Sequence, residues 1–327
     1  MRPVAVRTRG LGKRFGDLWA LHELDLEVPA GTVLGLLGHN GAGKTTAIRI
    51  LTTLTVPTTG TAEVAGLDVA SEPARVRSRI GLAGQYASVD ELMSARANLR
   101  MVGSLYHLPS AEVRCRADEL LERIGLVDVA DRLVRMFSGG MRRRLDLAAS
   151  LIASPPVLFL DEPTTGLDPQ SRNQIWTLLA ELVGDGATLI LTTQYLEEAD
   201  RIADQIVVLD HGRIAAQGMP SELKARLGGE RISVTLPKRD QLDVARAALA
   251  RFADGPVATD ATVPELTAPV VLSTRLVEVV RALDAAGIDA IDVTRRQATL
   301  DDVFLTLTGN HSAPTCDPDA APEAALR

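Results

Sequence analysis

The chain has 327 residues and a formal net charge of −7, with 46% hydrophobic and only 3% aromatic residues. This length favours two domains. The acidic balance argues against a protein that binds nucleic-acid duplexes, because such proteins are usually basic or carry a basic face. No apolar stretch approaches the roughly 18 residues of a membrane-spanning helix, and the N-terminus lacks the apolar core of a signal peptide. The two cysteines, Cys115 and Cys316, have no metal-site spacing and fit a reduced compartment.

The first motif along the chain is a phosphate-binding pattern between a predicted strand at 32–37 and a predicted helix at 47–54. The segment GHNGAGKTT at 38–46 fits G-x-x-x-x-G-K-[ST] in that context. Backbone amides at the helix N-terminus are expected to bind phosphate oxygens. Lys44 should reach the β- and γ-phosphates, and Thr45 should coordinate Mg²⁺. The predicted nucleotide-binding residues of this loop are Gly38, His39, Asn40, Gly41, Ala42, Gly43, Lys44, Thr45 and Thr46.

Two segments lie between this loop and the next strand. Gly84-Gln85-Tyr86 comes first. Further on, Ser138, Gly139 and Gly140 open a predicted helix and offer a second anion-binding end. The basic run at 142–144 follows on the same helix, and we favour a local structural or interface role for it over nucleic-acid binding.

The next predicted strand ends in two carboxylates. Residues 157–160 are apolar and lead into Asp161 and Glu162. Asp161 suits the coordination shell of Mg²⁺, and Glu162 suits the water that attacks the γ-phosphate. A further apolar strand at 188–193 follows and ends just before Gln194.

In this order the motifs resemble those of the ATP-binding subunits of ABC transporters. The resemblance covers residues 4–227, and it is closest to the daunorubicin/doxorubicin-resistance type of drug exporter ATPase. It implies ATP and Mg²⁺ as ligands, and ATP hydrolysis as the activity. The segments that carry it are GQYASVDE, SGGMRRRLDLAASL, DEPTTGLDP, LTTQYLEEAD and ATLDDVFLTLTG.

The resemblance also implies roles for residues outside the phosphate loop. Phe15 matches an aromatic that stacks on adenine; an ordinary core phenylalanine is the alternative. Gln85 matches a glutamine that contacts Mg²⁺ and senses the membrane partner; the alternative is a surface glutamine. Asp168 matches a dimer-contact aspartate and is also placed to cap a helix.

Two positions depart from the family pattern. Met141 stands where the serine–glycine signature usually ends in glutamine, which puts a polar contact to the partner-bound nucleotide in doubt. Gln194 stands where most relatives have histidine. The drug-resistance subgroup shares this glutamine, so with Glu162 intact we still expect hydrolysis, with Gln194 at the γ-phosphate.

The family architecture implies a homodimer. Two subunits hold two ATP molecules head to tail, so the Ser138–Gly140 signature of one chain serves the ATP bound by Lys44 of the other. This chain has one set of motifs and therefore needs a second copy or a paralogue.

The expected fold class is α/β with a second, smaller domain. An ABC ATP-binding domain with a mostly parallel core sheet is predicted for 1–228, with a helical subdomain at about 88–135. A small α+β domain over 229–308, for regulation or dimerisation, follows Gly228-Gly229. The Ala-, Pro- and Asp-rich tail at 309–327 should be disordered.

The small C-terminal domain is predicted to have the order β-α-β-β-α-β of a ferredoxin-like unit. It contains no catalytic motif. Its predicted elements are strands at 232–236, 256–259, 268–272 and 288–293 and helices at 242–252, 276–283 and 300–307.

The leading functional hypothesis is an energy-coupling ATPase of an exporter for a hydrophobic drug, antibiotic or lipid. It would work at the cytoplasmic face of the membrane, through a separate ABC-2-type permease and without nucleic acid. The alternatives are a soluble ABC ATPase acting on ribosomes or nucleic acid, and the ATPase of an importer. The first alternative typically has two ATPase units, a coiled-coil insertion or zinc cysteines, and the sequence has none of these.

Overall fold

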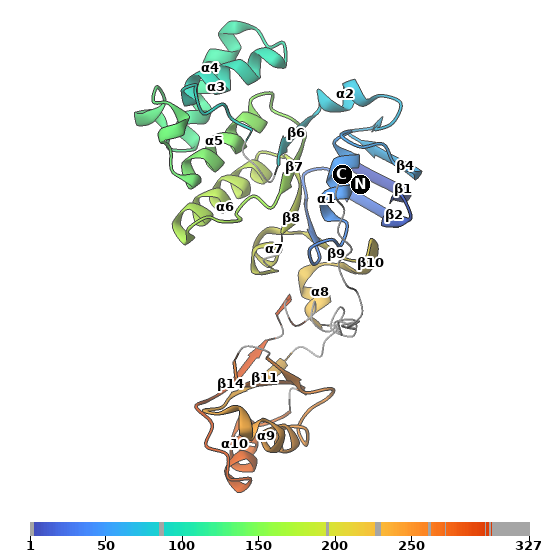
Figure 1. Cartoon of the computed structure of the whole chain (residues 1–327), viewed down its shortest axis with the longest axis vertical. Helices are drawn as coiled ribbons and strands as arrows, with labels where there is room; N and C mark the ends of the chain where they lie inside the picture. Colours follow the sequence, from blue (N-terminus) through green and yellow to red (C-terminus); the bar gives the residue numbers. More distant parts are fainter. Residues whose placement is uncertain are drawn as a thin grey trace, which may run out of the picture.

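The structure is a computed structural model that describes residues 3–84, 88–193, 196–225, 230–260, 263–271, 273–297, 299–300 and 302. Two units follow one another along the chain. The first runs from β1 to α8 and the second from β11 to β14 and on to Asp302, and they lie at opposite ends of the view in Figure 1.

The core of the first unit is a six-stranded sheet in the order β10-β9-β3-β8-β7-β6. All neighbouring strands are parallel except β10, which pairs antiparallel with β9. The central strands are buried along their whole length, as expected for apolar runs covered on both faces. The predicted parallel α/β core is thereby confirmed. The strands are β3 (Val33–Leu37), β6 (Ile80–Ala83), β7 (Val157–Asp161), β8 (Thr188–Thr193), β9 (Gln205–Asp210) and β10 (Arg213–Gly218).

An antiparallel sheet and a helical region flank this core (Figure 1). Helix α1 (Lys44–Leu51) packs its apolar side chains against both sheets. The region 88–135 is mainly helical, as predicted. The antiparallel strands are β1 (Val4–Phe15), β2 (Leu18–Pro29), β4 (Thr59–Val64) and β5 (Leu67–Asp68), and the other helices are α2 (Pro73–Arg77), α3 (Ala95–Leu105), α4 (Ser110–Arg123), α5 (Gly139–Leu151), α6 (Pro169–Gly184), α7 (Leu196–Ile202) and α8 (Pro220–Ala225), with 3₁₀ turns at Val127–Val129 and Val134–Met136.

The second unit is a four-stranded antiparallel sheet with two helices packed on it. Its sheet order, β12-β13-β11-β14, places the first strand between the third and the fourth. This is the arrangement of a ferredoxin-like unit and agrees with the predicted element order. The elements are β11 (Glu230–Thr235), a 3₁₀ turn (Arg239–Gln241), α9 (Leu242–Leu249), β12 (Ala258–Thr259), β13 (Glu265–Val270), α10 (Leu276–Ala285) and β14 (Asp292–Gln297).

Some predicted bounds are wrong. The helix after the phosphate loop begins at Lys44 rather than at 47, because the loop itself supplies its first turn. The last strand lies at Asp292–Gln297 rather than at 288–293. The apolar Ile288 is buried in the core before that strand begins, whereas half of the residues of β14, which pairs with β11, are charged. Most of the helix predicted at 300–307, and Gly228-Gly229, lie outside the described residues.

One residue near the end of the chain contacts the first unit. Leu300 is buried in a cluster with residues of β3, β9, α7 and α8. The second unit is therefore joined to the first by an apolar contact as well as by the connecting chain. The other buried members of this cluster are Leu37, Ala199, Ile206, Val208 and Leu223.

Candidate nucleotide and catalytic site

The phosphate loop lies at the carboxyl end of β3 and leads directly into α1. Gly43 has a φ of 106°, and a Cβ built there would lie 2.5 Å from the carbonyl oxygen of Ala20. Glycine is thus required both by the left-handed backbone and by the space. No side chain caps α1, so no capping side chain competes with an anion for its first amides.

Lys44 folds back over this loop. Its Nζ donates to the carbonyl oxygens of Gly38, at 2.7 Å, and His39, at 3.1 Å. Burial lowers the pKa of Lys44, and the carboxylates of Glu162 and Asp161 oppose that shift. The two carboxylates favour the charged form of Lys44, which is the form that can bind phosphate oxygens.

A cavity of about 330 Å³ joins the loop to the predicted catalytic carboxylate. Ligands of open parallel sheets bind at this carboxyl edge of the strands. The structure thus brings most of the predicted phosphate loop together with Glu162. The lining residues are Ala20, Asn40, Gly41, Ala42, Gly43, Lys44, Thr45, Thr46, Glu162 and Thr165.

The predicted cation ligands lie beside this cavity. Asp161 ends β7, and its Oδ1 accepts a hydrogen bond of 2.5 Å from Thr192 Oγ1. Thr45 Oγ1 lies 3.5 Å from the same oxygen. A hydroxyl and a carboxylate at this separation, next to a phosphate site, fit a shared Mg²⁺, which prefers oxygen ligands.

Glu162 leaves the strand with a φ of 49°. Its amide donates to the carbonyl oxygen and to the hydroxyl of Thr192, at 3.1 and 3.0 Å. Thr165 Oγ1 donates to Glu162 Oε2 at 3.2 Å. These contacts fix an uncommon left-handed backbone that turns the carboxylate toward the phosphate loop.

Arg143 lies behind the catalytic carboxylates, a position that could not be predicted from its place in the basic run at 142–144. The residue is 8% exposed. It donates to the carbonyl oxygens of Asp161, Glu162 and Pro163 and to that of Gly84. One guanidinium group therefore holds the end of β7 and the segment after β6 in place.

Asp146, which the sequence analysis missed, links Arg143 to the segment that follows Gln85. Asp146 Oδ1 accepts from the amide and the hydroxyl of Ser88, at 2.7 and 2.8 Å, and its Oδ2 lies 3.5 Å from Arg143. Burial raises the pKa of Asp146, while Ser88 and Arg143 oppose the shift.

A second missed residue is Glu198 on α7. This buried carboxylate accepts hydrogen bonds from Thr164, at 2.6 Å, and Thr193, at 2.8 Å. Thr164 follows the catalytic carboxylates, and Thr193 directly precedes Gln194. Glu198 therefore holds together the two segments next to the predicted catalytic residues.

The basic run at 142–144 has a local structural role, as predicted. Arg142 donates to the carbonyl oxygen of Phe137 and pairs with Glu91, and Arg144 donates to the carbonyl oxygen of Ile124. Together with Arg143, these side chains are engaged in contacts within the chain.

The serine–glycine signature opens α5, as predicted. Ser138 Oγ accepts from the amide of Met141 at 3.2 Å. Gly140 packs against Ser171 of α6, whose N-terminus is capped by Asp168 through the Ser171 amide at 2.9 Å. Neither Ser138 nor Gly139 lines the cavity at the phosphate loop.

The remaining predicted site residues fall into two groups. Phe15 is 53% exposed at the end of β1, so the core alternative is wrong. Lys13 Nζ lies 5.1 Å from the centre of its ring. Gln85 and Gln194 lie outside the described residues.

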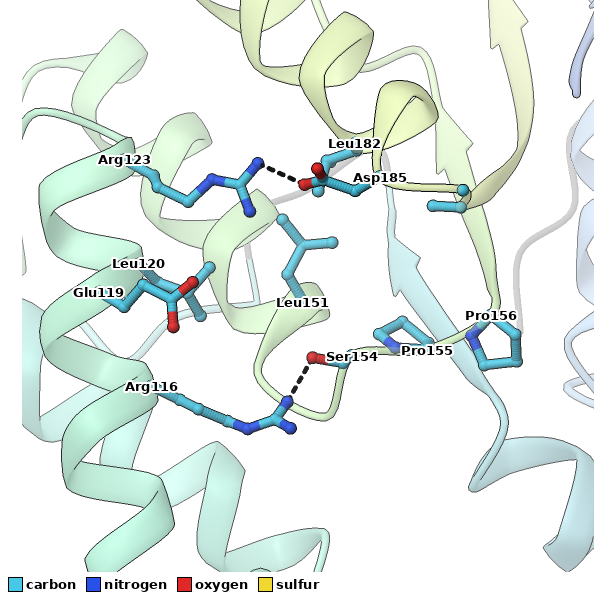
Figure 2. Close-up of a pocket in the computed structure, with 12 residues that line it drawn as sticks. Arg116, Glu119, Leu120, Arg123, Leu151, Ser154, Pro155, Pro156, Leu182 and Asp185 are labelled. Carbon is cyan, nitrogen blue, oxygen red and sulfur yellow. Dashed lines mark hydrogen bonds and ion pairs between the residues drawn. The ribbon is translucent and has the colours of Figure 1, made fainter. Parts of the chain in front are cut away.

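A larger cavity, of about 420 Å³, opens at the other end of the sheet. Figure 2 shows Arg116 reaching Ser154 and Arg123 reaching Asp185 across it. Its wall includes Pro156, which directly precedes β7. It therefore lies at the amino ends of the strands, where the sheet offers no phosphate loop.

A glycine-rich phosphate loop, a lysine and two strand-end carboxylates around one cavity define a P-loop nucleoside triphosphatase. No helix among the described residues is long and apolar enough to cross a bilayer.

Comparisons with known proteins give the family. Residues 21–165 match the ABC transporter family model. The chain is 52% identical to the daunorubicin resistance ATP-binding protein DrrA2 of Streptomyces coeruleorubidus, over 97% of this chain and 99% of that protein. It is 44% identical to the doxorubicin resistance ATP-binding protein of Mycobacterium tuberculosis, over 93% and 94% of the two chains.

Solved structures agree. An ATP-binding subunit of an ABC transporter superposes with a TM-score of 0.63 at 27% identity, over 68% of this chain and 93% of that chain. A dimeric ATP-binding cassette bound to ADP and Pi gives 0.60 at 25% identity, over 65% and 98%. The chain belongs to the ATP-binding subunits of ABC transporters, and its activity is ATP hydrolysis coupled to transport.

Proposed function

We propose that this protein powers export of a hydrophobic drug, antibiotic or lipid, as a homodimer at the cytoplasmic face of the membrane with an ABC-2-type permease. Two observations support the proposal. The cavity at the phosphate loop is lined by Lys44, Thr45 and Glu162, with Asp161 beside it, and near-full-length relatives carry drug-resistance names.

In this proposal Lys44 Nζ binds the γ-phosphate of ATP. Its hydrogen bonds to the carbonyl oxygens of Gly38 and His39 would be replaced by hydrogen bonds to phosphate oxygens. Thr45 and Asp161, with Gln85, would hold Mg²⁺, which neutralises developing charge when bound. Glu162 orients and deprotonates the attacking water, and Thr165 fixes one of its oxygens at 3.2 Å. Phe15, half exposed, offers a ring to adenine.

The second copy completes the site. Ser138 and Gly139 lie outside the lining of their own chain's phosphate-loop cavity, so the amino end of α5 remains available to an ATP bound by another chain. Asp168 and Ser171, which pack beside Gly140, would lie at the same contact between subunits.

The permease would dock beside the helical subdomain. Leu92 and Met136 are 73% and 60% exposed, and backbone hydrogen bonds join the two segments that carry them. Such an apolar pair on a polar surface fits a partner contact. From here Ser88, Asp146 and Arg143 form a continuous set of hydrogen bonds to the carbonyl oxygen of Glu162.

Copurification with an ABC-2-type permease coexpressed from the same organism tests the proposal. We expect a complex whose ATP turnover rises when a hydrophobic drug such as daunorubicin is added. Leu92→Glu should abolish the complex. Leu105→Glu should leave it intact, since Leu105 is equally exposed but lies at the far end of α3.

Other outcomes would overturn particular parts of the proposal. Copurification with ribosomes, or dependence on a soluble binding protein, would favour one of the alternative classes. A complex that Leu92→Glu leaves intact would move the docking surface elsewhere.

A further inference from the structure

Three polar side chains meet at the outer edge of the phosphate loop. They are His39 of the loop, Asp210 at the end of β9 and His211 in the turn to β10. His39 Nε2 lies 3.0 Å from Asp210 Oδ1, and His211 Nε2 lies 3.8 Å from the same oxygen. One ligand atom from each residue lies within 4.8 Å of the others.

The hydrogen bonds of His39 indicate its tautomer when the ring is neutral: Nδ1 is protonated, and Nε2, which faces Asp210, is not. Its Nδ1 lies 2.7 Å from the carbonyl oxygen of Asn40, which can only accept, so Nδ1 carries a proton. In the neutral ring Nε2 is then a bare lone pair pointing at Asp210. A cation between the two atoms removes this conflict, and an Nδ1–H bonded to a carbonyl is the usual support of a histidine that binds metal through Nε2.

The spacing fits a small, borderline-soft divalent ion. Zinc forms bonds of roughly 2.0–2.1 Å to imidazole nitrogen and carboxylate oxygen, which places neighbouring tetrahedral ligands about 3.3 Å apart. The observed 3.0 and 3.8 Å lie on either side of that value. Two imidazoles and one carboxylate suit zinc rather than Mg²⁺, which prefers oxygen.

The three residues are held together by the backbone as well. The amide of Gly212 donates to Ala42 in the phosphate loop at 3.0 Å, and the amide of His22 donates to Gly212 at 2.8 Å. His211 has a φ of 45°, a conformation that is uncommon outside glycine and that costs energy. The turn is thus fixed against the loop, and the rings of His39 and His211 lie with their centroids 5.1 Å apart.

The three side chains also leave room for entry and for a fourth ligand. Asp210 is 17% exposed at its side chain, whereas His39 is 36% and His211 70% exposed. A metal approaching from solvent would meet His211 first and keep water at its open position.

We propose that His39, Asp210 and His211 form a binding site for a zinc-class divalent cation, separate from the magnesium site at Thr45 and Asp161. The ion ties the phosphate loop to the β9–β10 turn. The alternative explanation of the short distance between His39 Nε2 and Asp210 Oδ1 is a proton on Nε2. In that case His211 would have no role at the site.

Zinc titration of the full-length protein tests this. The two cysteines are first alkylated, because thiolates bind zinc, and millimolar Mg²⁺ is kept present to occupy the magnesium site. Binding is measured by competition with a chromogenic chelator. We expect one tight site per chain, and a Kd at least tenfold higher in His211→Asn, which removes one ligand.

A matched control is available in His107→Asn. His107 also has a left-handed backbone, with a φ of 58°, and is exposed, but it lies far along the chain between α3 and α4. Asparagine tolerates this conformation at both positions, so neither substitution should disturb the fold. His107→Asn is expected to bind zinc as the parent does.

Cobalt provides a readout of geometry. Co²⁺ in place of zinc should give the strong visible absorption of a four-coordinate site in the parent and in His107→Asn, and lose it in His211→Asn. Absence of tight zinc binding in the parent, or equal affinity in the parent and His211→Asn, would overturn the proposal. Basal ATP turnover in His211→Asn should equal the parental value, which separates this test from the proposed function.

Discussion

The two units of the chain use buried charge differently. In the ATPase unit, buried Lys44 and Asp161 lie beside a cavity that a ligand can enter. In the C-terminal unit, Asp302 is also buried, but Arg296 binds both of its oxygens and Arg231 lies 3.7 Å away. In the ATPase unit the charged groups can interact with a bound substrate. In the C-terminal unit the carboxylate is neutralised by arginines of the same unit. Buried charge therefore indicates chemistry only where it faces an open space.

The comparison predicts the largest loss of ATP turnover for substitution of Glu162. Glu162→Gln keeps the size of the side chain but removes the base, so ATP turnover should fall by roughly 10²–10⁴-fold. ATP affinity should persist, and an ATP-bound dimer should accumulate. Lys44→Ala should instead weaken ATP binding itself. Both variants are tested by steady-state ATP turnover and by equilibrium nucleotide binding. If Glu162→Gln turned over ATP at the parental rate, Glu162 would not be the catalytic base.

Arg143 tests whether a fully satisfied charge can still support the chemistry. Arg143→Met leaves up to four carbonyl oxygens without their donor, each costing about 1–3 kcal/mol if it stays buried. We expect a lower melting temperature and a kcat at least tenfold lower, with the KM for ATP less affected.

The control for Arg143 is its neighbour. Arg144→Met removes hydrogen bonding to a single carbonyl, that of Ile124, and should retain near-parental kcat. Equal kcat in the two variants would mean that Arg143 does not position the end of β7.

A smaller effect is expected at Gln194. This residue follows β8, which runs parallel to β7 and ends beside Asp161. A glutamine amide can donate to phosphate and accept from water, but it has no protonation change near neutral pH. Gln194→Ala should lower turnover with ATP affinity nearly unchanged, and Gln194→His should stay active. Turnover from pH 5.5 to 8.5 measures this; a parental rate in Gln194→Ala would place the residue away from the γ-phosphate.

The phosphate loop and the strand-end carboxylates were predictable because their chemistry lies in contiguous residues. For Arg143 only a local structural or interface role was predicted, because the carbonyl oxygens that it binds are 18 to 59 residues away. A signal was present: Gly140, Arg143 and Leu147 share the spacing of one helix face, and all three are buried.

The C-terminal unit shows the opposite case. Its order of elements could be predicted from alternation and helical spacing, yet the position of its last strand could not. That strand reads Asp-Val-Thr-Arg-Arg-Gln and has a single apolar residue, so it shows no apolar alternation. A backbone ladder pairs it with β11, and Arg295 forms an ion pair with Glu230 across the two strands.

The smallest effect concerns Asp302. Burial works against ionisation of Asp302, but the hydrogen bond from Arg296 and its other partners lower the pKa overall. A lowered folded pKa contributes stability above the unfolded pKa, near 3.9, which is lost as pH falls through the folded pKa. Asp302→Asn should therefore lower the melting temperature by a nearly constant amount from pH 7 to pH 5. The difference from the parent should shrink only below about pH 4.

Nucleotide affinity in the same variant separates the two units. Because the charges around Asp302 are satisfied among themselves, Asp302→Asn should bind ATP as the parent does. Melting curves over the pH range, with ATP titrations at pH 7, measure both quantities. A loss of ATP affinity in a folded Asp302→Asn protein would show that the C-terminal ion pairs act on the phosphate loop, and the division between charge kept for substrate and charge used for structure would not hold.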